Sequence, residues 1–467
     1  MYVLDSNNKI PLHIQLYQAI KKDITSSYKI GDKLFSIRKM CNIYNLSKTT
    51  VSNAYSQLVI EGYIDSKNRS SYFVIENNYK DIDASCFNEM NASKIKKAQY
   101  DYDFYPARQE KNSFPLKIWK RLSNKSLLES LDYCDNLQAQ GEYALRTEIT
   151  KYLIASREVK CDASQVIICH GFDDSMLLLS KILKHTHTSF AIESPGYKLA
   201  KDIFCEQGYL IDEISLNENG IILDELEKSK SKVLYLTPSH QFPTGLSIPI
   251  KNRLLLLAWA KKNKALIIED DYDSELSYYN RPIPSLQGLD ENDSVVYLGT
   301  FSKSLAPSLR ISYMVLPKHL LSAYSNLSDS KHARVSLMLQ NTLSLFMKEG
   351  FWDKHQRKIR TSNKRKHNLM KELLLKKLKD TVIIKSEGIG LSLVIDSKEK
   401  MDFKCLEIMA RKEAIKIYFV HDVAHGDYDG IRMGFGGLKE EDLPEAIESF
   451  SKVWFLCLKE TKKLSLL

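Results

Sequence analysis

The sequence lacks long apolar runs and closely spaced cysteines. No apolar stretch approaches the roughly 18 uninterrupted residues that a membrane-spanning helix requires, and the start MYVLDSNNK has no apolar core of the kind found in signal peptides. The eight cysteines are scattered and form no CxxC pair, which argues against a disulfide framework and against a cysteine-bound zinc ion. We therefore expect a cytoplasmic protein with reduced thiols and no membrane partner.

Histidine is also sparse, with 11 in the chain. Two pairs have the spacing of metal ligands, His185 with His187 and His421 with His425, but neither comes with a third ligand at a suggestive spacing. The sequence therefore predicts no metal site.

The chain does have length and an excess of positive charge. Its 467 residues exceed what one hydrophobic core usually organises, so we expect at least two domains. The net charge is +9, and residues 1–80 hold eleven Lys or Arg against six Asp or Glu. This bias favours a polyanionic partner for the N-terminal part, although a solvated basic surface would have the same composition.

The first 76 residues have the pattern of a winged helix-turn-helix. Apolar residues recur at helical spacing over residues 12–24, Ser36 can cap a short second helix, and Ser47 can cap a third. Two β-rich runs, residues 62–65 and 72–75, follow around a polar, basic turn. The predicted buried stripe of the third helix is Val51, Ala54, Tyr55 and Leu58. Three helices followed by a wing favour DNA binding over a merely polar surface.

The start of the third helix carries groups that suit nucleic acid. Hydroxyl, amide and amine side chains at a helix N-terminus can bond phosphates and base edges. This helix offers Ser47, Lys48, Thr49, Thr50 and Asn53.

The module resembles the GntR family of regulators. The matching residues are Pro11-Leu12, Gln15-Leu16-Tyr17, Ser36-Ile37-Arg38, Ser47-Lys48-Thr49-Thr50-Val51, Ala54-Tyr55, Leu58 and Glu61-Gly62-Tyr63. The resemblance implies contacts with double-stranded DNA through the third helix, Arg38 and the wing residues Lys67, Arg69 and Ser70. Phe35 stands where the family usually has proline, and Arg69-Ser70-Ser71 stands where Gly-Ser-Gly is common, so the wing departs from the family pattern.

Residues 77–100 are polar and show no hydrophobic periodicity, so we interpret them as a linker between domains 1–76 and 101–467. Beyond the linker, short apolar runs alternate with longer amphipathic stretches, which predicts an α/β fold with parallel strands joined by helices. The clearest predicted strands are residues 165–169, 189–192, 232–236, 265–268 and 295–298. Later runs predict a smaller α+β subdomain from about residue 355 to 467.

Polar residues follow each of these strands, and in an open α/β sheet such residues gather at one edge, where ligands bind. Lys303 can condense with an aldehyde there, while Thr300, Ser302 and a helix start hold a phosphate, with Arg310 as a further charged contact. An aspartate after strand 265–268 can pair with a protonated pyridine nitrogen. Tyr197 can stack on the ring.

Three longer motifs resemble the MocR/GabR-type regulators, in which a GntR head is fused to a fold-type-I aminotransferase domain. They are Thr300-Phe301-Ser302-Lys303-Ser304-Leu305-Ala306-Pro307, Thr237-Pro238-Ser239-His240-Gln241-Phe242-Pro243-Thr244-Gly245 and Ile268-Glu269-Asp270-Asp271-Tyr272-Asp273-Ser274-Glu275. Similarity extends to Gln140-Gly141-Glu142-Tyr143 and Arg432-Met433-Gly434-Phe435, so it covers nearly the whole chain.

This resemblance implies pyridoxal 5′-phosphate (PLP) as the cofactor. Lys303 matches the Schiff-base lysine, and Asp270 matches the partner of the pyridine nitrogen, with Asp271 as the neighbouring alternative. Arg432 matches the arginine that binds a substrate carboxylate. The other matches are Tyr272 for the ring hydroxyl, Tyr197 for stacking, Arg310, Thr300 and Ser302 for the phosphate, and Gly171, Phe172 and Asp173 for a loop that offers amides to that phosphate.

Three functions are compatible with this sequence. The favoured one is a homodimeric regulator that reads paired DNA half-sites and senses an amino acid or PLP itself. The alternatives are an active aminotransferase with a DNA-tethering head, and an aminotransferase-like scaffold that only dimerises. Leu199 stands where GABA-responsive relatives carry a second arginine, which disfavours a GABA-like effector, and Phe242 replaces an asparagine that true aminotransferases place near the cofactor.

Overall fold

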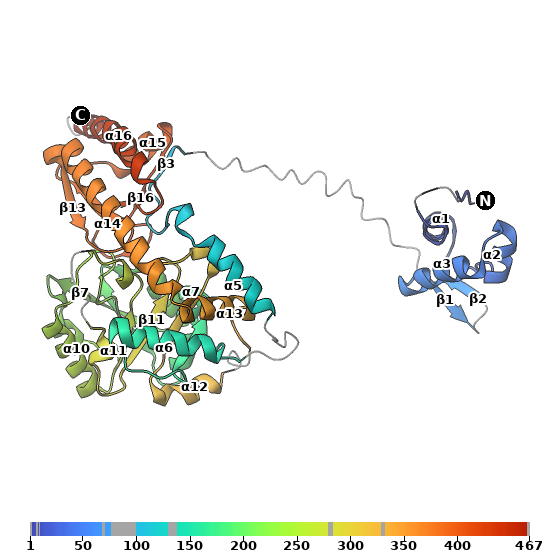
Figure 1. The fold of residues 1–467 in the computed structure, drawn as a ribbon, viewed down its shortest axis with the longest axis horizontal. Coiled ribbons are helices and arrows are strands. Elements are labelled where there is room, and N and C mark those ends of the chain that lie inside the picture. The colour runs from blue at the N-terminus through green and yellow to red at the C-terminus, as the bar shows by residue number, and fades with distance from the viewer. Residues whose placement is uncertain are drawn as a thin grey trace. The chain divides into compact units, whose positions relative to one another are not determined.

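The computed structural model describes residues 2–5, 8, 10–67, 71–75, 100–128, 138–278, 284–327 and 332–464. Its internal contacts divide the chain into two units, Met1–Ala98 and Gln99–Leu467. Figure 1 shows a small helical unit with a short hairpin and a larger unit of helices around a sheet. Each unit has a hydrophobic core of its own.

The first unit is a winged helix-turn-helix, as predicted. It consists of α1 (Leu12–Ser27), α2 (Ile37–Tyr44), α3 (Lys48–Ile60) and the antiparallel hairpin β1 (Ile64–Lys67) with β2 (Ser71–Val74). The side chains of Ser36 and Ser47 cap α2 and α3, accepting hydrogen bonds from the amides of Lys39 and Thr50. The predicted stripe of α3 is fully buried.

The second unit contains an eight-stranded mixed sheet. Its strand order is β4-β12-β11-β10-β9-β5-β7-β8, in which β7, β5, β9, β10 and β11 run parallel and β12 and β8 run antiparallel to their neighbours. The strands are β4 (Val166–Cys169), β5 (Ser189–Ser194), β7 (Leu210–Asn217), β8 (Gly220–Ile221), β9 (Val233–Leu236), β10 (Leu266–Asp270), β11 (Val295–Thr300) and β12 (Ser312–Val315). The five predicted strands are confirmed, whereas the periodicity did not reveal β7, β8 and β12.

Helices cover both faces of this sheet, which explains why its central strands are apolar throughout. Alternate residues of β4 belong to different cores: Ile167 packs with α7 and α8, and Ile168 packs with α5, α6 and α13. The helices are α5 (Leu116–Leu128), α6 (Tyr143–Arg157), α7 (Gly171–Leu183), α8 (Lys198–Glu206), α9 (Leu223–Lys228), α10 (Ile250–Asn263), α11 (Leu286–Leu289), α12 (Leu321–Ser325) and α13 (Leu337–Lys348).

A smaller α+β layer follows the long helix α14 (Phe351–Leu378), whose residues 357–367 (RKIRTSNKRKH) are rich in lysine and arginine. Its sheet has the order β13-β14-β18-β16, and α14, α15 and α16 pack on its core. The elements are β13 (Val382–Ser386), β14 (Ser392–Ser397), α15 (Phe403–Lys412), β16 (Tyr418–Phe419), β18 (Ile431–Gly434) and α16 (Leu443–Leu464).

The run 415–420 forms two strands with different partners. β15 (Ile415–Lys416) pairs in parallel with β3 (Tyr102–Asp103), while β16 pairs with β18. A second short pairing joins β17 (Ala424–His425) to β6 (Gly196–Tyr197). None of the helices that the structure describes is long and apolar enough to cross a membrane.

Candidate functional site

A cavity of about 310 Å³ opens where the central strands of the large sheet end. This volume is within the range of small-molecule sites. Lys303 lies in this cavity, and the other predicted cofactor or effector residues that line it are Phe172, Tyr197, Asp270, Tyr272, Thr300, Ser302, Arg310 and Arg432. Gly171 and Asp173 do not line the cavity and lie beside it, in the first turn of α7.

Lys303 is placed on the loop after β11, with its amine in the cavity. Its Nζ atom lies 3.7 Å from Asp273 Oδ2 and 4.1 Å from the centre of the Tyr272 ring. Burial lowers the pKa of Lys303, although Asp273 opposes this shift. A lowered pKa increases the share of neutral amine, which is the form that attacks an aldehyde.

Asp270 ends β10 and faces the cavity. Tyr235 donates a hydrogen bond of 2.7 Å to Asp270 Oδ2 from the neighbouring strand. Burial raises the pKa of Asp270 to about 7, against the stabilising effect of Tyr235. A carboxylate in this position can pair with a protonated ring nitrogen, which would compensate the cost of burying its charge.

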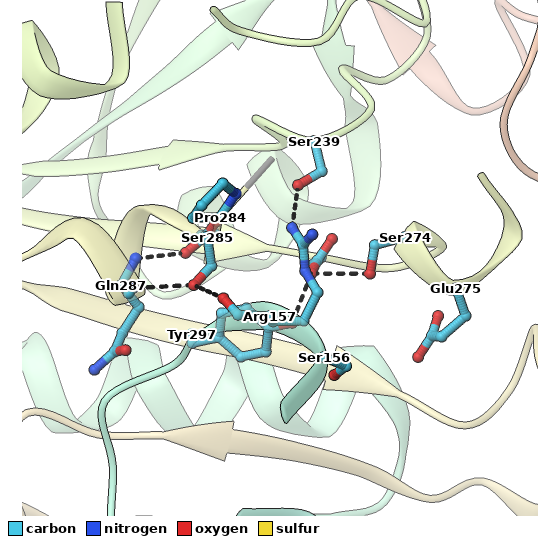
Figure 2. Close-up of polar contacts among 12 residues, drawn as sticks. Ser156, Arg157, Ser239, Ser274, Glu275, Pro284, Ser285, Gln287 and Tyr297 are labelled. Carbon is cyan, nitrogen blue, oxygen red and sulfur yellow. Dashed lines mark hydrogen bonds and ion pairs between the residues drawn. The ribbon is translucent and has the colours of Figure 1, made fainter. Parts of the chain in front are cut away.

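Asp271, the neighbouring alternative, is turned into the protein. Arg157 Nε lies 2.7 Å from Asp271 Oδ2, which also accepts hydrogen bonds from Tyr297 at 2.6 Å and Ser274 at 3.0 Å. Figure 2 shows the Arg157 guanidinium directed toward Ser239, whose Oγ accepts a hydrogen bond of 2.7 Å from it. Asp271 does not line the cavity. The geometry therefore favours Asp270 as the residue that meets a ring nitrogen.

One end of the cavity suits a phosphate. Thr300, Ser302 and Arg310 line it, next to the N-terminus of α7, where backbone amides and the helix dipole favour an anion. Gly171 has a φ of +85°, and a Cβ atom there would overlap the Arg310 guanidinium. Glycine thus leaves room for Arg310 beside the helix start. Arg310 forms an ion pair with the Asp173 carboxylate, so the Asp173 side chain competes for Arg310 and only its backbone can assist an anion.

The other end of the cavity is aromatic and carries Arg432 from β18. The Arg432 guanidinium lies 5.2 Å from the centre of the Phe242 ring, and burial lowers its pKa. Among the residues that the structure describes, no carboxylate forms an ion pair with Arg432. The Tyr197 ring contacts Phe172 at 5.2 Å and Phe242 at 5.3 Å between ring centres. A carboxylate ligand would therefore meet a desolvated cation within an aromatic wall.

The structure adds polar residues that the motifs alone did not single out. Asp273 Oδ2 lies 3.0 Å from His240 Nδ1, and the Tyr272 hydroxyl donates a 2.9 Å bond to the His240 carbonyl. Burial opposes ionisation of Asp273, but His240 and Lys303 outweigh it and lower the pKa of its carboxyl. Both residues belong to motifs quoted above. Asp273 lies three residues after Asp270, and His240 lies four residues after the end of β9, so their positions just after strands could have marked them as site residues.

Tyr105 and Ala107 also line the cavity. They lie far from every other lining residue in sequence and outside any quoted motif. No pattern in the sequence could have found them, because only the folded chain brings this segment to the sheet edge.

The predicted DNA-contacting residues of the first unit form an open surface. Arg38, Ser47, Lys48, Thr49 and Asn53 are exposed, and Thr50 is half-buried. The hydroxyls of Ser47 and Thr50 lie 2.8 Å apart, and Ser47 also accepts from the Thr50 amide, so both are partly engaged in the cap. Arg69, Ser70 and the side chain of Lys67 lie outside the described residues.

Comparison with protein families gives two matches. Residues 12–74 match bacterial regulatory proteins of the gntR family, and residues 105–450 match aminotransferase class I and II. The second match alone spans more than half of the chain.

Similar curated proteins share both parts. The HTH-type transcriptional regulator YdeL of Bacillus subtilis is 36% identical, covering 95% of this chain and 97% of its own length. The probable rhizopine catabolism regulatory protein MocR of Rhizobium meliloti is 28% identical over 100% of this chain and 98% of its own. The pyridoxine biosynthesis regulator PdxR of Corynebacterium glutamicum is 26% identical over 88% and 89%.

Solved structures with a similar fold are aminotransferases. An archaeal alanine:glyoxylate aminotransferase covers 80% of this chain and 95% of its own, with a TM-score of 0.68 and 19% identity. The kynurenine aminotransferase of Pyrococcus horikoshii, solved with PMP, covers 81% and 98%, with a TM-score of 0.67 and 23% identity. The fold-type-I prediction is confirmed. The chain belongs to the gntR family of DNA-binding transcriptional regulators that carry a PLP-dependent aminotransferase class I and II domain.

Proposed function

We propose that this regulator holds PLP on Lys303 and uses the cavity to sense a small ligand. The domains act as a DNA-binding head (residues 1–76), a linker (77–100) and a sensory and dimerisation domain (101–467, with a small subdomain from about 355). Two heads in a homodimer read paired half-sites in the cytoplasm. The ligand is an amino acid bound through its carboxylate, or PLP itself.

The observation that supports this proposal is the shared cavity of Lys303, Asp270, Arg310 and Arg432. When bound, PLP supplies an aldehyde for an amine and an electron-poor ring. The chain's own groups match it end to end: Arg310, Thr300 and Ser302 at the phosphate, Asp270 at the ring nitrogen and Lys303 at the aldehyde. Arg432 remains for a further carboxylate, because no carboxylate of the described part forms an ion pair with it.

The test measures cofactor and DNA binding on the same full-length protein. PLP should give a visible absorbance band that borohydride fixes on Lys303. Affinity for a duplex selected by the protein from a random pool should then change when PLP is added, or when an amino-acid panel is added to the PLP-bound protein. A response to PLP alone identifies the cofactor as the signal, and a response only to the panel identifies an amino acid. Absence of the band, or DNA binding indifferent to both, would contradict the sensory function.

An active aminotransferase is the second candidate, since Lys303, Asp270 and Arg432 lie in the same cavity and their chemistry supports turnover as well as binding. The amino-acid panel separates the two functions. Steady production of keto acid over many turnovers would favour the enzyme, and at most one equivalent per PLP would favour the sensor.

A further inference from the structure

Residues 101–110, called the inlet segment here, are where the chain enters the second unit, and backbone hydrogen bonds tie its first half to the small subdomain. The amide of Asp101 donates to the Ala414 carbonyl at 2.8 Å, and the amide of Phe104 donates to the Lys416 carbonyl at 3.0 Å. Between them, β3 pairs with β15. The Phe104 side chain is fully buried in the core of that subdomain. The inlet segment therefore moves with this subdomain.

The middle of the inlet segment passes directly beside the strand that carries Arg432. The amide of Gly434 donates a 3.0 Å bond to the Phe104 carbonyl, and a Cβ atom on Gly434 would overlap the Tyr105 backbone. A Cβ on Gly436 would stand 2.6 Å from the Arg108 carbonyl. The glycines after Arg432 are thus explained by this close approach. Tyr105 and Ala107 then form part of the cavity wall.

Near its C-terminal end, the inlet segment is hydrogen-bonded to the backbone of Lys303. Gln109, only 8% exposed, donates from Nε2 to the Lys303 carbonyl at 3.0 Å. Its Oε1 accepts from Asn363 Nδ2 of α14 at 2.9 Å, so both ends of the amide are used. Glu110 next to it forms a 2.7 Å ion pair with the buried Lys366, also of α14.

The inlet segment therefore contacts two parts of the site, β18 near Arg432 through the Phe104 carbonyl and the Lys303 backbone through Gln109. It is pinned along its length by hydrogen bonds, so a shift of the Lys303 backbone relative to Arg432 has to displace the segment. The same segment is the first part of the domain that the linker reaches.

We propose that Gln109 is a positioning residue that couples the Lys303 backbone to the inlet segment. Binding of PLP in the cavity then stabilises this segment, and the change in its stability reaches the linker. The inference rests on the proposed function, because it assumes that PLP binds at Lys303. It adds the route by which binding is transmitted, a series of hydrogen-bonded and packed groups between the site and the linker.

Hydrogen exchange of the full-length protein, with and without PLP, tests the link. PLP should slow exchange of the amides at residues 300–303 and also at residues 101–104, the latter by about fivefold or more. The Gln109→Met substitution removes both side-chain hydrogen bonds at similar volume. In this variant PLP should still give its absorbance band and slow residues 300–303, while the effect at residues 101–104 disappears.

Two further variants complete the test. Gln109→Glu keeps the acceptor for Asn363 and removes the donor to Lys303, so it should also lose the effect at residues 101–104, and it replaces the methionine variant if that one does not fold. Arg108→Ala is the matched control from the same segment. The half-exposed Arg108 side chain pairs with Asp103 and lies over the Tyr105 ring, but no described hydrogen bond links it to Lys303, so this variant should keep the effect of PLP at residues 101–104.

Two results would overturn the coupling: wild-type protection at residues 300–303 without any at 101–104, or full protection at 101–104 in both Gln109 variants. A wild-type protein with no absorbance band and no slowing at residues 300–303 would instead overturn the proposed function itself. The two failures are therefore distinguishable.

Discussion

The start of α3, where we propose contacts with DNA, and the Lys303 cavity both contain charged residues but place them in opposite surroundings. Lys48 and Arg38 project into solvent, whereas Asp270 and Asp271 are buried within hydrogen-bond networks. Exposed charges are screened by salt, and each contributes separately to the affinity for DNA. Buried charges are coupled, because each one shifts the protonation of its neighbours. Substitutions in the head should therefore have graded effects, and those in the cavity should have large, pH-dependent ones.

The largest effect is expected from Lys303→Ala. Lys303 supplies the only amine among the described residues that line the cavity, so the variant should lose covalent PLP completely. Its affinity for DNA without PLP should remain at the wild-type value, because the head has its own core. Absorbance, and mass spectrometry after borohydride reduction, measure the first effect. A reduced PLP adduct on another residue of this variant would contradict the assignment.

Asp270→Asn should change how stability depends on pH in the PLP-free protein. The raised pKa of about 7 means that folded Asp270 holds its proton where the unfolded chain releases it. Its stabilising contribution is complete below the unfolded pKa and is lost as pH rises through about 7. From pH 5 to pH 8, wild type should therefore lose about 3 kcal/mol of unfolding free energy that the variant does not lose. Urea unfolding at the two pH values measures this difference.

Asp271→Asn is the matched control, one residue away. It removes the partner of a buried arginine, Arg157, so it should destabilise the domain by about 3–5 kcal/mol at both pH values. If both variants showed the same pH profile, the two aspartates would not differ in environment as the structure indicates.

The same pair of aspartates shows where sequence reasoning ends. Motif and strand position placed both residues at the ligand-binding edge of the sheet, one as the last residue of β10 and one directly after it. Successive residues of an extended chain point to opposite faces. Which face meets the cavity depends on the register of β10 between β9 and β11, and on Arg157, which comes from the end of α6. Local patterns predicted the strands, the caps of α2 and α3 and the lysine loop. The same patterns did not indicate which of Asp270 and Asp271 points into the cavity.

Long-range placement was the second limit. Lys303, Tyr272 and Arg310 follow strands and could be assigned to one edge, because parallel strands bring their ends together. Tyr105 and Ala107 line the same cavity, and the segment that carries them begins with the pairing of β3 with β15, which is two residues long on each strand. Such a short pairing leaves no periodic pattern. A three-helix head with helical periodicity and serine caps depends on local contacts, which is why its elements were predicted closely.

Lys48→Ala should have a moderate effect that depends on salt. Loss of one phosphate contact should weaken binding to the selected duplex by about fivefold near physiological salt and reduce the salt slope by about 1. Lys22→Ala on α1 is the control, since it removes the same exposed charge elsewhere in the head. Titrations at several salt concentrations measure the slope. Equal slopes in the two variants would mean that Lys48 makes no specific phosphate contact.

The smallest effect is expected at the rim of the cavity, where the two kinds of environment meet. Arg310 and Asp173 form an ion pair, but their side chains are 41% and 55% exposed, so the pair is worth at most about 1 kcal/mol. Asp173→Asn releases Arg310 for the phosphate and should therefore tighten PLP binding by about threefold. The gain should shrink as ionic strength rises, because an exposed pair is screened and a buried one is not. Weaker binding in the variant would show that the Asp173 carboxylate orients Arg310 toward the phosphate rather than competing for it.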